Sequence, residues 1–420
     1  MPLTTRAAAT SPEVPPQPPR PSLLPASASP IHRLPDDTLQ HIFSSLPLRD
    51  TFSSRSVCRQ FREALSSIHF LTLLPALRIL ALRHPRHHHQ SSHHQHPPSL
   101  LAFDPSSSRW LRFPLSFLPF PSLSPVTASS SLLYLWADHL PSPSSDSKPP
   151  KSLVLCNPLT RSFRVLPPLG SAWSRHGTVL AAPAAAGSAV LVLTELAALS
   201  YSPGAASWRK FSLNLPSKPR SPVIVGASIY SLCDIGSPWR NQWKLFSCSI
   251  ADLGGPRGWV QLERLEWGDV FDILKRPRLV RGGGSDQILM IGGLRSSFAV
   301  DAPCSTVLIL RLNLGSMDWE EAGRMPPEMY RCFAGVVGQG ATAVAANAGG
   351  NNKVKVFGGE GRVWFSGKRV RGKMAMWEEE EEVEKGAGSR GIWKWVDGAP
   401  GYGDGVFRGF VLDAAVTEIP

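Results

Sequence analysis

One short pattern recurs four times after residue 100, and it constrains the fold more than any other feature of the sequence. In each copy an apolar run ends on a polar residue and an aromatic follows six positions later: Asp104–Trp110, Asn157–Phe163, Ser202–Trp208 and Asn313–Trp319. In the first three copies a proline follows the polar residue directly. A polar residue followed by proline begins a turn, and the aromatic then opens the returning strand. The pattern therefore predicts a β-hairpin that is used repeatedly.

The spacing of these hairpins indicates how they are arranged. With Trp259 as a fifth copy, the aromatics are 53, 45, 51 and 60 residues apart, and Trp393 or Trp395 ends a sixth. Repeats of about 40–50 residues are typical of propeller blades with four strands each. A β-sandwich is the alternative, but it does not require the same hairpin four times. We therefore expect an all-β propeller of about six blades over residues 100–420.

Two further features fit blades that close into a ring. The segments 223–234, 288–294 and 355–364 have the character of strands near the axis, and Gly292–Gly293 and Gly358–Gly359 suit crowded backbone. An open ring would leave an unpaired strand edge. The apolar segment 407–416 therefore predicts closure by pairing with the blade that holds Trp110, with Phe407, Phe410 and Leu412 buried.

Length and composition indicate more than one unit. A single core rarely exceeds ~250–300 residues, and the chain has 420. Residues 1–30 are rich in proline and read as a disordered tail, and residues 76–99, with their His/Pro tract, read as a linker. The net charge is +12, but Lys and Arg are scattered, which favours acidic protein partners over nucleic acid.

Residues 31–75 form a helical block of different character. Leu39, Ile42, Phe43 and Leu46 share one helix face, Asp36 can cap that helix, and Pro47 ends it. A second helix is expected near residues 50–55. A third is expected from about residue 57, with an inner side formed by Val57, Phe61, Leu65 and Ile68. Three short helices bury little surface alone, so such a unit requires a partner.

Cysteine usage and hydropathy bear on the compartment. The six cysteines are widely spaced without a C-x-x-C pair, which predicts buried thiols in a reducing compartment, the nucleus and/or the cytoplasm. The most apolar stretch, residues 178–199, contains proline, glycine and glutamate, so we expect paired core strands there and no membrane span. A plastid transit peptide is the alternative for the N-terminus, but its tandem prolines favour a solvated tail.

The sequence shows no pattern that predicts a catalytic residue, a metal site or a bound cofactor. Seven histidines crowd residues 84–96, but no predicted element would fix their geometry, so a linker is favoured over a Zn²⁺ site. The Gly/Ala-rich segment 338–350 does not join a strand to a helix as a nucleotide-binding turn would. The acidic run 378–382 predicts a solvated loop insertion in the last blade, or alternatively a contact for a basic target.

The helical block resembles an F-box. The resemblance lies in Leu34–Pro35, Leu39, Ile42–Phe43, Leu46–Pro47, Arg55, Val57–Cys58–Arg59, Phe61 and Phe70. Phe61 stands where the typical F-box has Trp, which is a difference of size. The repeats that follow resemble the kelch-type propeller of plant F-box/kelch-repeat proteins.

The resemblance implies a small all-α F-box of three helices followed by a propeller, and a role in Skp–cullin–F-box ubiquitin ligases. The F-box would bind a Skp-type adaptor, and through it a cullin and a RING protein, while the propeller would hold an unknown protein target. The adaptor-binding residues it implies are Leu34, Pro35, Leu39, Ile42, Phe43, Leu46, Pro47, Val57, Cys58, Arg59 and Phe61. A non-degradative scaffold or inhibitor, and a propeller enzyme, are the alternatives. No nucleic-acid or membrane partner is expected.

Overall fold

The computed structural model describes most of the chain: residues 30–74, 77–83, 98–138, 151–182, 189–237, 240–255, 258–297, 304–334, 354–380, 391–400, 406–415 and 420. Contacts divide the chain into two compact units, Met1–Leu73 and Leu74–Pro420. Residues 1–29 of the tail predicted over 1–30, the His/Pro tract from residue 84 to 97 and the Gly/Ala-rich segment 338–350 lie outside the described residues, whereas Pro30 begins a short 3-10 helix.

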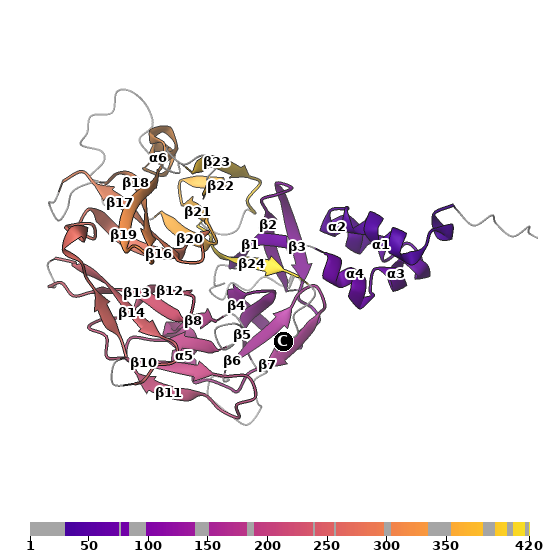
Figure 1. Cartoon of the computed structure of the whole chain (residues 1–420), viewed down its shortest axis with the longest axis horizontal. Coiled ribbons are helices and arrows are strands. Elements are labelled where there is room, and N and C mark those ends of the chain that lie inside the picture. The colour runs from indigo at the N-terminus through magenta and orange to yellow at the C-terminus, as the bar shows by residue number, and fades with distance from the viewer. Residues whose placement is uncertain are drawn as a thin grey trace, which may run out of the picture. The chain divides into compact units, whose positions relative to one another are not determined.

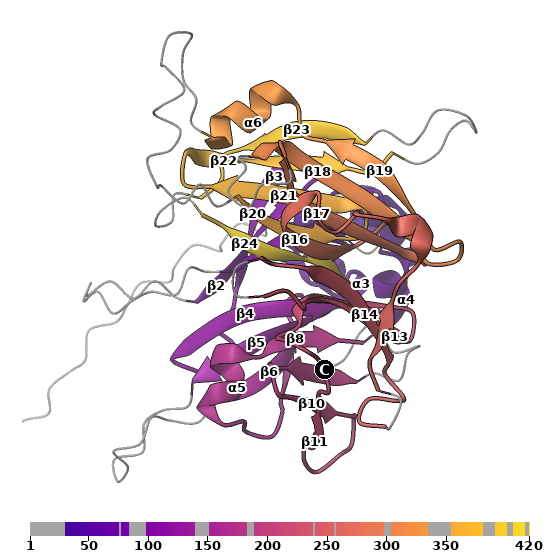
Figure 2. The same ribbon diagram turned by 90° about the vertical axis from the view of Figure 1, so that its left-hand side faces the viewer.

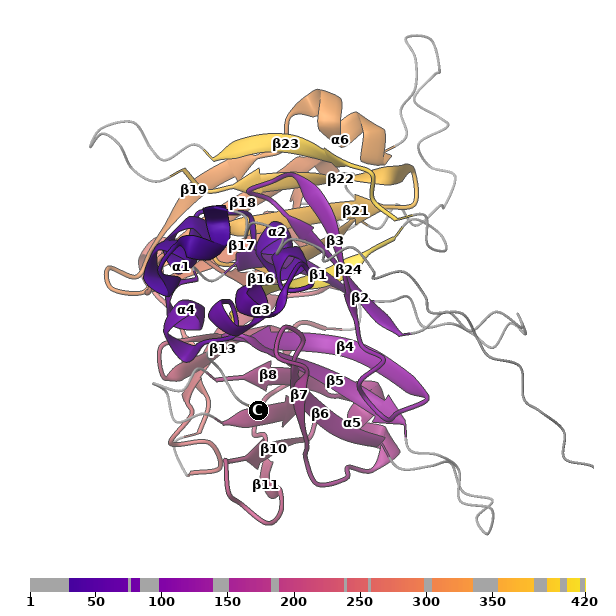
Figure 3. The same cartoon turned by 90° about the vertical axis from the view of Figure 1, so that its right-hand side faces the viewer.

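The first unit is helical, as expected (Figure 3). It consists of η1 (Pro30–Arg33), α1 (Asp36–Ser44), α2 (Leu48–Ser54), α3 (Arg59–Ala64) and α4 (Ile68–Leu73). The fourth α-helix was not anticipated. It begins because the Ser67 hydroxyl accepts a hydrogen bond from the backbone N–H of Phe70 at 3.2 Å, which satisfies a free donor of the first turn.

The second unit is a β-propeller, and Figure 1 shows its sheets arranged around a common centre. The described residues form six four-stranded antiparallel sheets. Blade 1 contains β24 (Arg408–Ala414), β1 (Leu77–Arg83), β2 (Ser99–Asp104) and β3 (Arg109–Pro114). Blade 2 contains β4 (Ser122–Ser129), β5 (Leu132–Asp138), β6 (Lys151–Asn157) and β7 (Ser162–Val165). Blade 3 contains β8 (Thr178–Ala181), β9 (Val190–Leu193), β10 (Ala197–Tyr201) and β11 (Arg209–Ser212).

The remaining three blades follow the same order along the chain. Blade 4 contains β12 (Arg220–Val225), β13 (Ser228–Asp234), β14 (Trp243–Ser249) and β15 (Val260–Leu262). Blade 5 contains β16 (Leu274–Arg281), β17 (Gln287–Arg295), β18 (Cys304–Asn313) and β19 (Asp318–Arg324). Blade 6 contains β20 (Lys355–Gly359), β21 (Arg362–Gly367), β22 (Val370–Glu378) and β23 (Ile392–Asp397). The innermost strands contact one another in the order β24, β4, β8, β12, β16, β20 and back to β24, which closes the ring.

The C-terminal segment closes the ring as predicted. β24 pairs with β1 in the blade that holds Trp110, from Leu77 opposite Ala414 to Arg83 opposite Arg408. Phe407, Phe410 and Leu412 are 3%, 7% and 0% exposed. The expected linker over 76–99 is wrong in its first part, because residues 77–83 form β1. Leu80 and Leu82 bury their side chains in the blade, so the propeller begins at Leu77.

The repeated hairpin joins the third and fourth strands of a blade, and its polar residue acts through its side chain. The Oδ1 atoms of Asp104, Asn157 and Asn313 each accept a backbone N–H from two residues further on, at 2.9, 3.0 and 2.8 Å. This contact mimics a backbone turn and explains why Asp and Asn recur there. The aromatics open the fourth strands, with Phe103 opposite Trp110 and Leu312 opposite Trp319.

The recurring aromatics join successive blades. Trp110 of blade 1 donates its indole N–H to the Asp397 carbonyl of blade 6, and Trp208 of blade 3 donates to the Pro167 carbonyl after β7, both at 2.9 Å. Short helices lie in three of the connections between blades: α5 (Ser171–His176), η3 (Leu265–Trp267) and α6 (Pro327–Ala334). Figure 2 shows α6 beside β22 and β23, where Met329 and Phe333 are buried.

The cysteines are free thiols. Cys156, Cys233 and Cys248 are buried, as expected, and burial raises the pKa of the Cys156 thiol to about 12. Cys332 is exposed on α6, which corrects the expectation that all six are buried. The apolar stretch at 178–199 contributes β8, β9 and β10 to blade 3. No helix in the described part of the chain is long and apolar enough to cross a membrane.

Candidate adaptor-binding surface

The helical unit is built around α1. Pro35 occupies the N-cap position and Asp36 is the first helical residue, so the predicted capping by the Asp36 side chain is wrong; no side-chain cap bond forms. Asp36 and Asp37 still lie in the first turn, where the helix dipole favours acidic groups. Leu39 and Phe43 are 0% and 4% exposed and form the buried face of α1.

The buried face of α1 packs on α3 and α4. The rings of Phe43 and Phe61 meet edge to face, with centroids 4.9 Å apart. Leu65 and Phe70 are fully buried in the same unit. The large side chains that the structure shows buried in this unit are Leu39, Phe43, Phe61, Leu65 and Phe70, and they stabilise the unit only modestly, since each contributes about 1.5–3 kcal/mol against the chain entropy. Binding to a partner would add apolar burial that this unit lacks.

Polar contacts hold the helices in register. The Gln40 side chain donates to the Ser67 hydroxyl at 3.0 Å, and its carbonyl oxygen lies 2.9 Å from Nδ1 of His69. The Arg55 guanidinium donates twice to the Leu65 carbonyl, at 2.6 and 3.2 Å. Arg55 therefore acts inside the unit, where burial lowers its pKa.

A set of apolar side chains remains exposed on this unit, outside its core. We name it the apolar surface of the helical unit; its members and exposed fractions are Ile31 37%, Ile42 39%, Leu46 37%, Val57 67%, Ile68 82% and Leu73 46%. Pro35 and Pro47 are exposed as well, and Leu34 is half-buried. So many exposed apolar side chains on one small unit indicate that it binds a protein partner.

The predicted adaptor-binding residues fall into two groups. Leu34, Pro35, Ile42, Leu46, Pro47 and Val57 are available to a partner, whereas Leu39, Phe43 and Phe61 form the core. The Sγ of Cys58 caps α3 by accepting the N–H of Phe61 at 3.4 Å. Arg59 is exposed and pairs with Glu63 at 2.8 Å.

Two positions differ from the expected pattern. Val57 and Ile68 were expected on an inner face, but both are largely exposed. The reason is that α3 begins only at Arg59, so Val57 precedes the helix and Ile68 begins α4. Ile31, Ile68 and Leu73 were not predicted as surface groups. No signal in the sequence indicated them, because Ile68 and Leu73 lie on α4, which was not anticipated, and Ile31 lies on η1.

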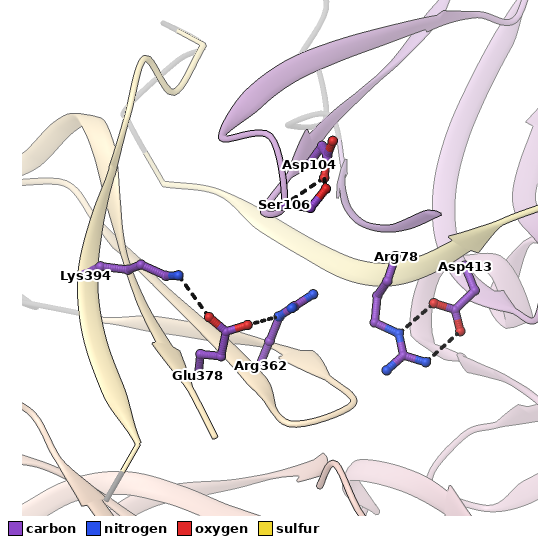
Figure 4. A network of polar contacts seen from close by, with 7 residues as sticks. All are labelled: Arg78, Asp104, Ser106, Arg362, Glu378, Lys394 and Asp413. Atoms are coloured by element: carbon purple, nitrogen blue, oxygen red, sulfur yellow. Dashed lines mark hydrogen bonds and ion pairs between the residues drawn. The ribbon is translucent and has the colours of Figure 1, made fainter. Parts of the chain in front are cut away.

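On the propeller, several charged side chains pair across neighbouring strands (Figure 4). Glu378 accepts one hydrogen bond from Nε of Arg362 at 2.6 Å and pairs with Lys394 at 2.9 Å. Burial opposes its ionisation, but these partners outweigh burial and hold the pKa of its carboxyl below the usual value. Asp104 and Ser106 form the turn contact described above, also drawn in Figure 4.

The acidic run does not begin as a solvated loop. Glu378 is the last residue of β22, and Glu379 pairs with Arg311 at 2.7 Å while its Oε2 accepts the backbone N–H of Gly283 at 3.0 Å. The predicted loop insertion is therefore wrong for these two residues. The rest of the run, from residue 381, lies outside the described residues.

The expectation that the chain holds no metal applies first to the described residues. No group of three or more His, Cys, Asp or Glu side chains there could hold a metal ion. The histidine tract at 84–96 falls in a stretch that the structure does not describe, so its interpretation as a linker stays a prediction.

Known proteins match this chain both over its helical unit and over nearly its whole length. The F-box domain model matches residues 31–73. SKP1-interacting partner 15 of Arabidopsis thaliana is 51% identical over 405 residues, covering 94% of this chain and 100% of that protein. Protein UNUSUAL FLORAL ORGANS, from the same plant, is 30% identical over 152 residues, covering 33% of this chain and 32% of that protein.

Solved structures resemble the propeller only loosely. An oligogalacturonate lyase in complex with manganese has a TM-score of 0.38 and 14% identity, covering 67% of this chain and 70% of that chain, which carries no argument about chemistry. The informative similarity is the one to SKP1-interacting partner 15, which extends over nearly the full length of the chain. On that relation and the match over its helical unit, the chain belongs to the family of F-box proteins that includes SKP1-interacting partner 15.

Proposed function

We propose that the protein is the substrate receptor of a Skp–cullin–F-box ubiquitin ligase. The observation that carries this proposal is an F-box unit with an exposed apolar surface joined in one chain to a closed six-bladed propeller. A relative that matches nearly the whole chain is named as a partner of SKP1, which supports an adaptor of that type for this chain. Through the adaptor the chain would reach a cullin and a RING protein.

The adaptor contact falls to the exposed members of the predicted set. Ile42, Leu46 and Val57 would insert into an apolar groove of the adaptor, next to Leu34–Pro35 and Pro47. Leu39, Phe43 and Phe61 would act indirectly, because they hold α1 and α3 in place. Cys58 and Arg59 would act at the start of α3, through the cap and the exposed charge.

The chain itself would carry out no bond chemistry. A receptor works by holding its target next to the ligase's charged ubiquitin carrier, which raises the local concentration of the two reactants. The propeller would supply the rigid platform for the target, since loops on such a scaffold carry specificity. The nucleus and/or the cytoplasm is the compartment we propose, supported by six free thiols.

The second candidate is an F-box scaffold or inhibitor that binds adaptor and partner without ubiquitin transfer. Capture of propeller-bound proteins from cells with a blocked proteasome separates the two. We expect ubiquitin on proteins captured with the wild-type chain, and markedly less on those captured with a Leu34→Ala/Pro35→Ala variant. Equal ubiquitin on both samples would contradict the receptor assignment, and bound partners without ubiquitin in either would favour the scaffold.

A further inference from the structure

Arginines gather at one end of the propeller axis. In the β1–β24 pair, Arg83 lies opposite Arg408 at one end, whereas Arg78 lies opposite Asp413 at the other. β12 and β16 bring further arginines to the first of these ends. We call this set of arginines the basic mouth; its members are Arg83, Arg220, Arg276, Arg278, Arg295 and Arg408.

The members of the basic mouth are close enough to repel one another. Burial and then the charge of Arg408 lower the pKa of Arg83, to about 10, and also lower that of Arg278. Burial and then the charges of Arg278 and Arg276 lower the pKa of Arg220 to about 10. A pKa of about 10 leaves Arg83 and Arg220 charged at neutral pH, and Asp234 offsets only part of the charge around Arg220, so blades 1, 4 and 5 present concentrated positive charge at this end.

The opposite end of the axis is neutralised. Arg78 pairs with Asp413 at 2.7 Å (Figure 4), and Arg281 at the end of β16 pairs with Glu360 at 3.0 Å. Glu379 also belongs to this end, since it accepts the N–H of Gly283 in the β16–β17 turn. The unbalanced charge is therefore a property of one face and not of the propeller as a whole.

Two of the arginines have a structural role. β4 and β16 each carry a register shift, and these bulges free carbonyl groups. Arg83 donates to the Val126 carbonyl in the first bulge, and Arg220 donates to the Pro277 carbonyl in the second at 2.9 Å. These contacts tie blade 1 to blade 2 and blade 4 to blade 5, so they need no ligand.

The other four arginines have no such partner. Among the described residues, no carboxylate or hydrogen-bond acceptor contacts the side chains of Arg276, Arg278, Arg295 and Arg408. Arg276 and Arg408 are exposed, and Nε of Arg295 is buried without an acceptor in the described structure. Arg276 and Arg295 line a cavity of about 180 Å³ between blades 4 and 5, next to Arg240 and Lys275. Asp272, the acid in that lining, lies 3.4 Å from Arg240.

We propose that the basic mouth binds an acidic segment of a protein target through its Asp and Glu carboxylates. The inference rests on the proposed function, because it specifies the chemistry of the target that the receptor holds. Guanidinium groups suit this role, since their planar fork matches a carboxylate with two parallel hydrogen bonds.

The arrangement favours an extended segment over a single compact anion. Arg278 and Arg408 lie near the axis, whereas Arg276 and Arg295 line the side cavity, so the unpaired charges form two neighbouring subsites. One carboxylate can satisfy one subsite, and several carboxylates along an extended chain can reach both. Glu378 and Glu379 of the chain's own acidic run do not supply them, because partners hold these two residues on the outer edge and at the opposite end.

The test uses the full chain and a short labelled peptide that alternates Glu with Ser, with fluorescence anisotropy as the readout. We expect saturable binding that weakens as salt rises, no binding of the matched Gln–Ser peptide, and at least about tenfold weaker binding by Arg276→Gln/Arg408→Gln. The control Arg109→Gln/Arg164→Gln also removes two positive charges, but from exposed positions on β3 and β7, and it should bind the peptide like wild type.

Several outcomes would overturn the inference. These are equal binding of the Gln peptide, equal weakening by the control variant, binding only when the peptide carries phosphate, or tighter binding of a single-stranded oligonucleotide through the same arginines. Adaptor binding is measured on the same samples. If the wild type and Arg276→Gln/Arg408→Gln both bind the adaptor normally but the wild type does not bind the acidic peptide, this inference fails while the proposed function stands.

Discussion

Deleting residues 405–420 is expected to leave the protein insoluble or to lower its melting temperature sharply. The deletion removes β24, the innermost strand of blade 1, together with the buried Phe407, Phe410 and Leu412. Burying three such side chains contributes roughly 5–9 kcal/mol, which is comparable with the whole stability of a typical domain. The loss would also expose the edge of β1 and break the ring between β20 and β4.

The matched control for that deletion stops the chain after residue 415. It keeps β24 and the Ala415 carbonyl that accepts the Asn157 side-chain amide at 2.8 Å, so its soluble yield and melting curve should equal those of the wild type. Differential scanning fluorimetry and the soluble fraction after expression measure both variants. A 405–420 deletion that stays soluble with an unchanged melting curve would show that the ring does not depend on β24.

Replacing Glu379 with alanine is expected to have the second large effect. Arg311 is 7% exposed at its side chain and pairs with Glu379, itself 14% exposed, at 2.7 Å. Removing the buried partner of a buried arginine costs about 3–5 kcal/mol when no other carboxylate remains, and somewhat less here because Arg311 keeps its contact with the exposed Glu320. Glu379 also accepts the N–H of Gly283, so the turn between β16 and β17 loses an acceptor as well. We expect the thermal midpoint of the full chain to fall by at least ~5 °C.

Glu320 provides a control on the same arginine. It pairs with Arg311 at 2.9 Å but is 57% exposed, so Glu320→Ala should cost less than about 1 kcal/mol. If both variants melt alike, burial does not distinguish the two contacts, and the last turn of β22 contributes less to stability than its geometry indicates.

The hairpins and the ring closure were predictable because their causes are local or topological. A turn needs its Asp or Asn within two residues of the N–H that it accepts, and such a contact repeats in the sequence at fixed spacing. Closure follows from the need to pair a strand edge. β1 was missed because its run, residues 77–83, stands directly before the His/Pro tract and has no turn residue pattern of its own.

The surfaces were harder to predict for a physical reason. The phase of α3 depends on where its cap lies, and Cys58 places the start two residues after Val57, which turns Val57 outward. The basic mouth includes Arg83, Arg220, Arg278 and Arg408, which are far apart in sequence and meet only when the ring closes. Likewise, nothing near Glu379 in the sequence indicates Arg311 as its partner.

Titration of the purified full chain with a purified Skp-type adaptor tests the central claim most directly. The wild type should form a one-to-one complex, and Ile42→Asp/Val57→Asp should weaken it by at least about a hundredfold, because each change places a charge in an apolar contact. Leu265→Asp, at a leucine that is 98% exposed on the propeller, should bind like wild type. Undiminished binding by Ile42→Asp/Val57→Asp, with its helical unit folded, would contradict the account.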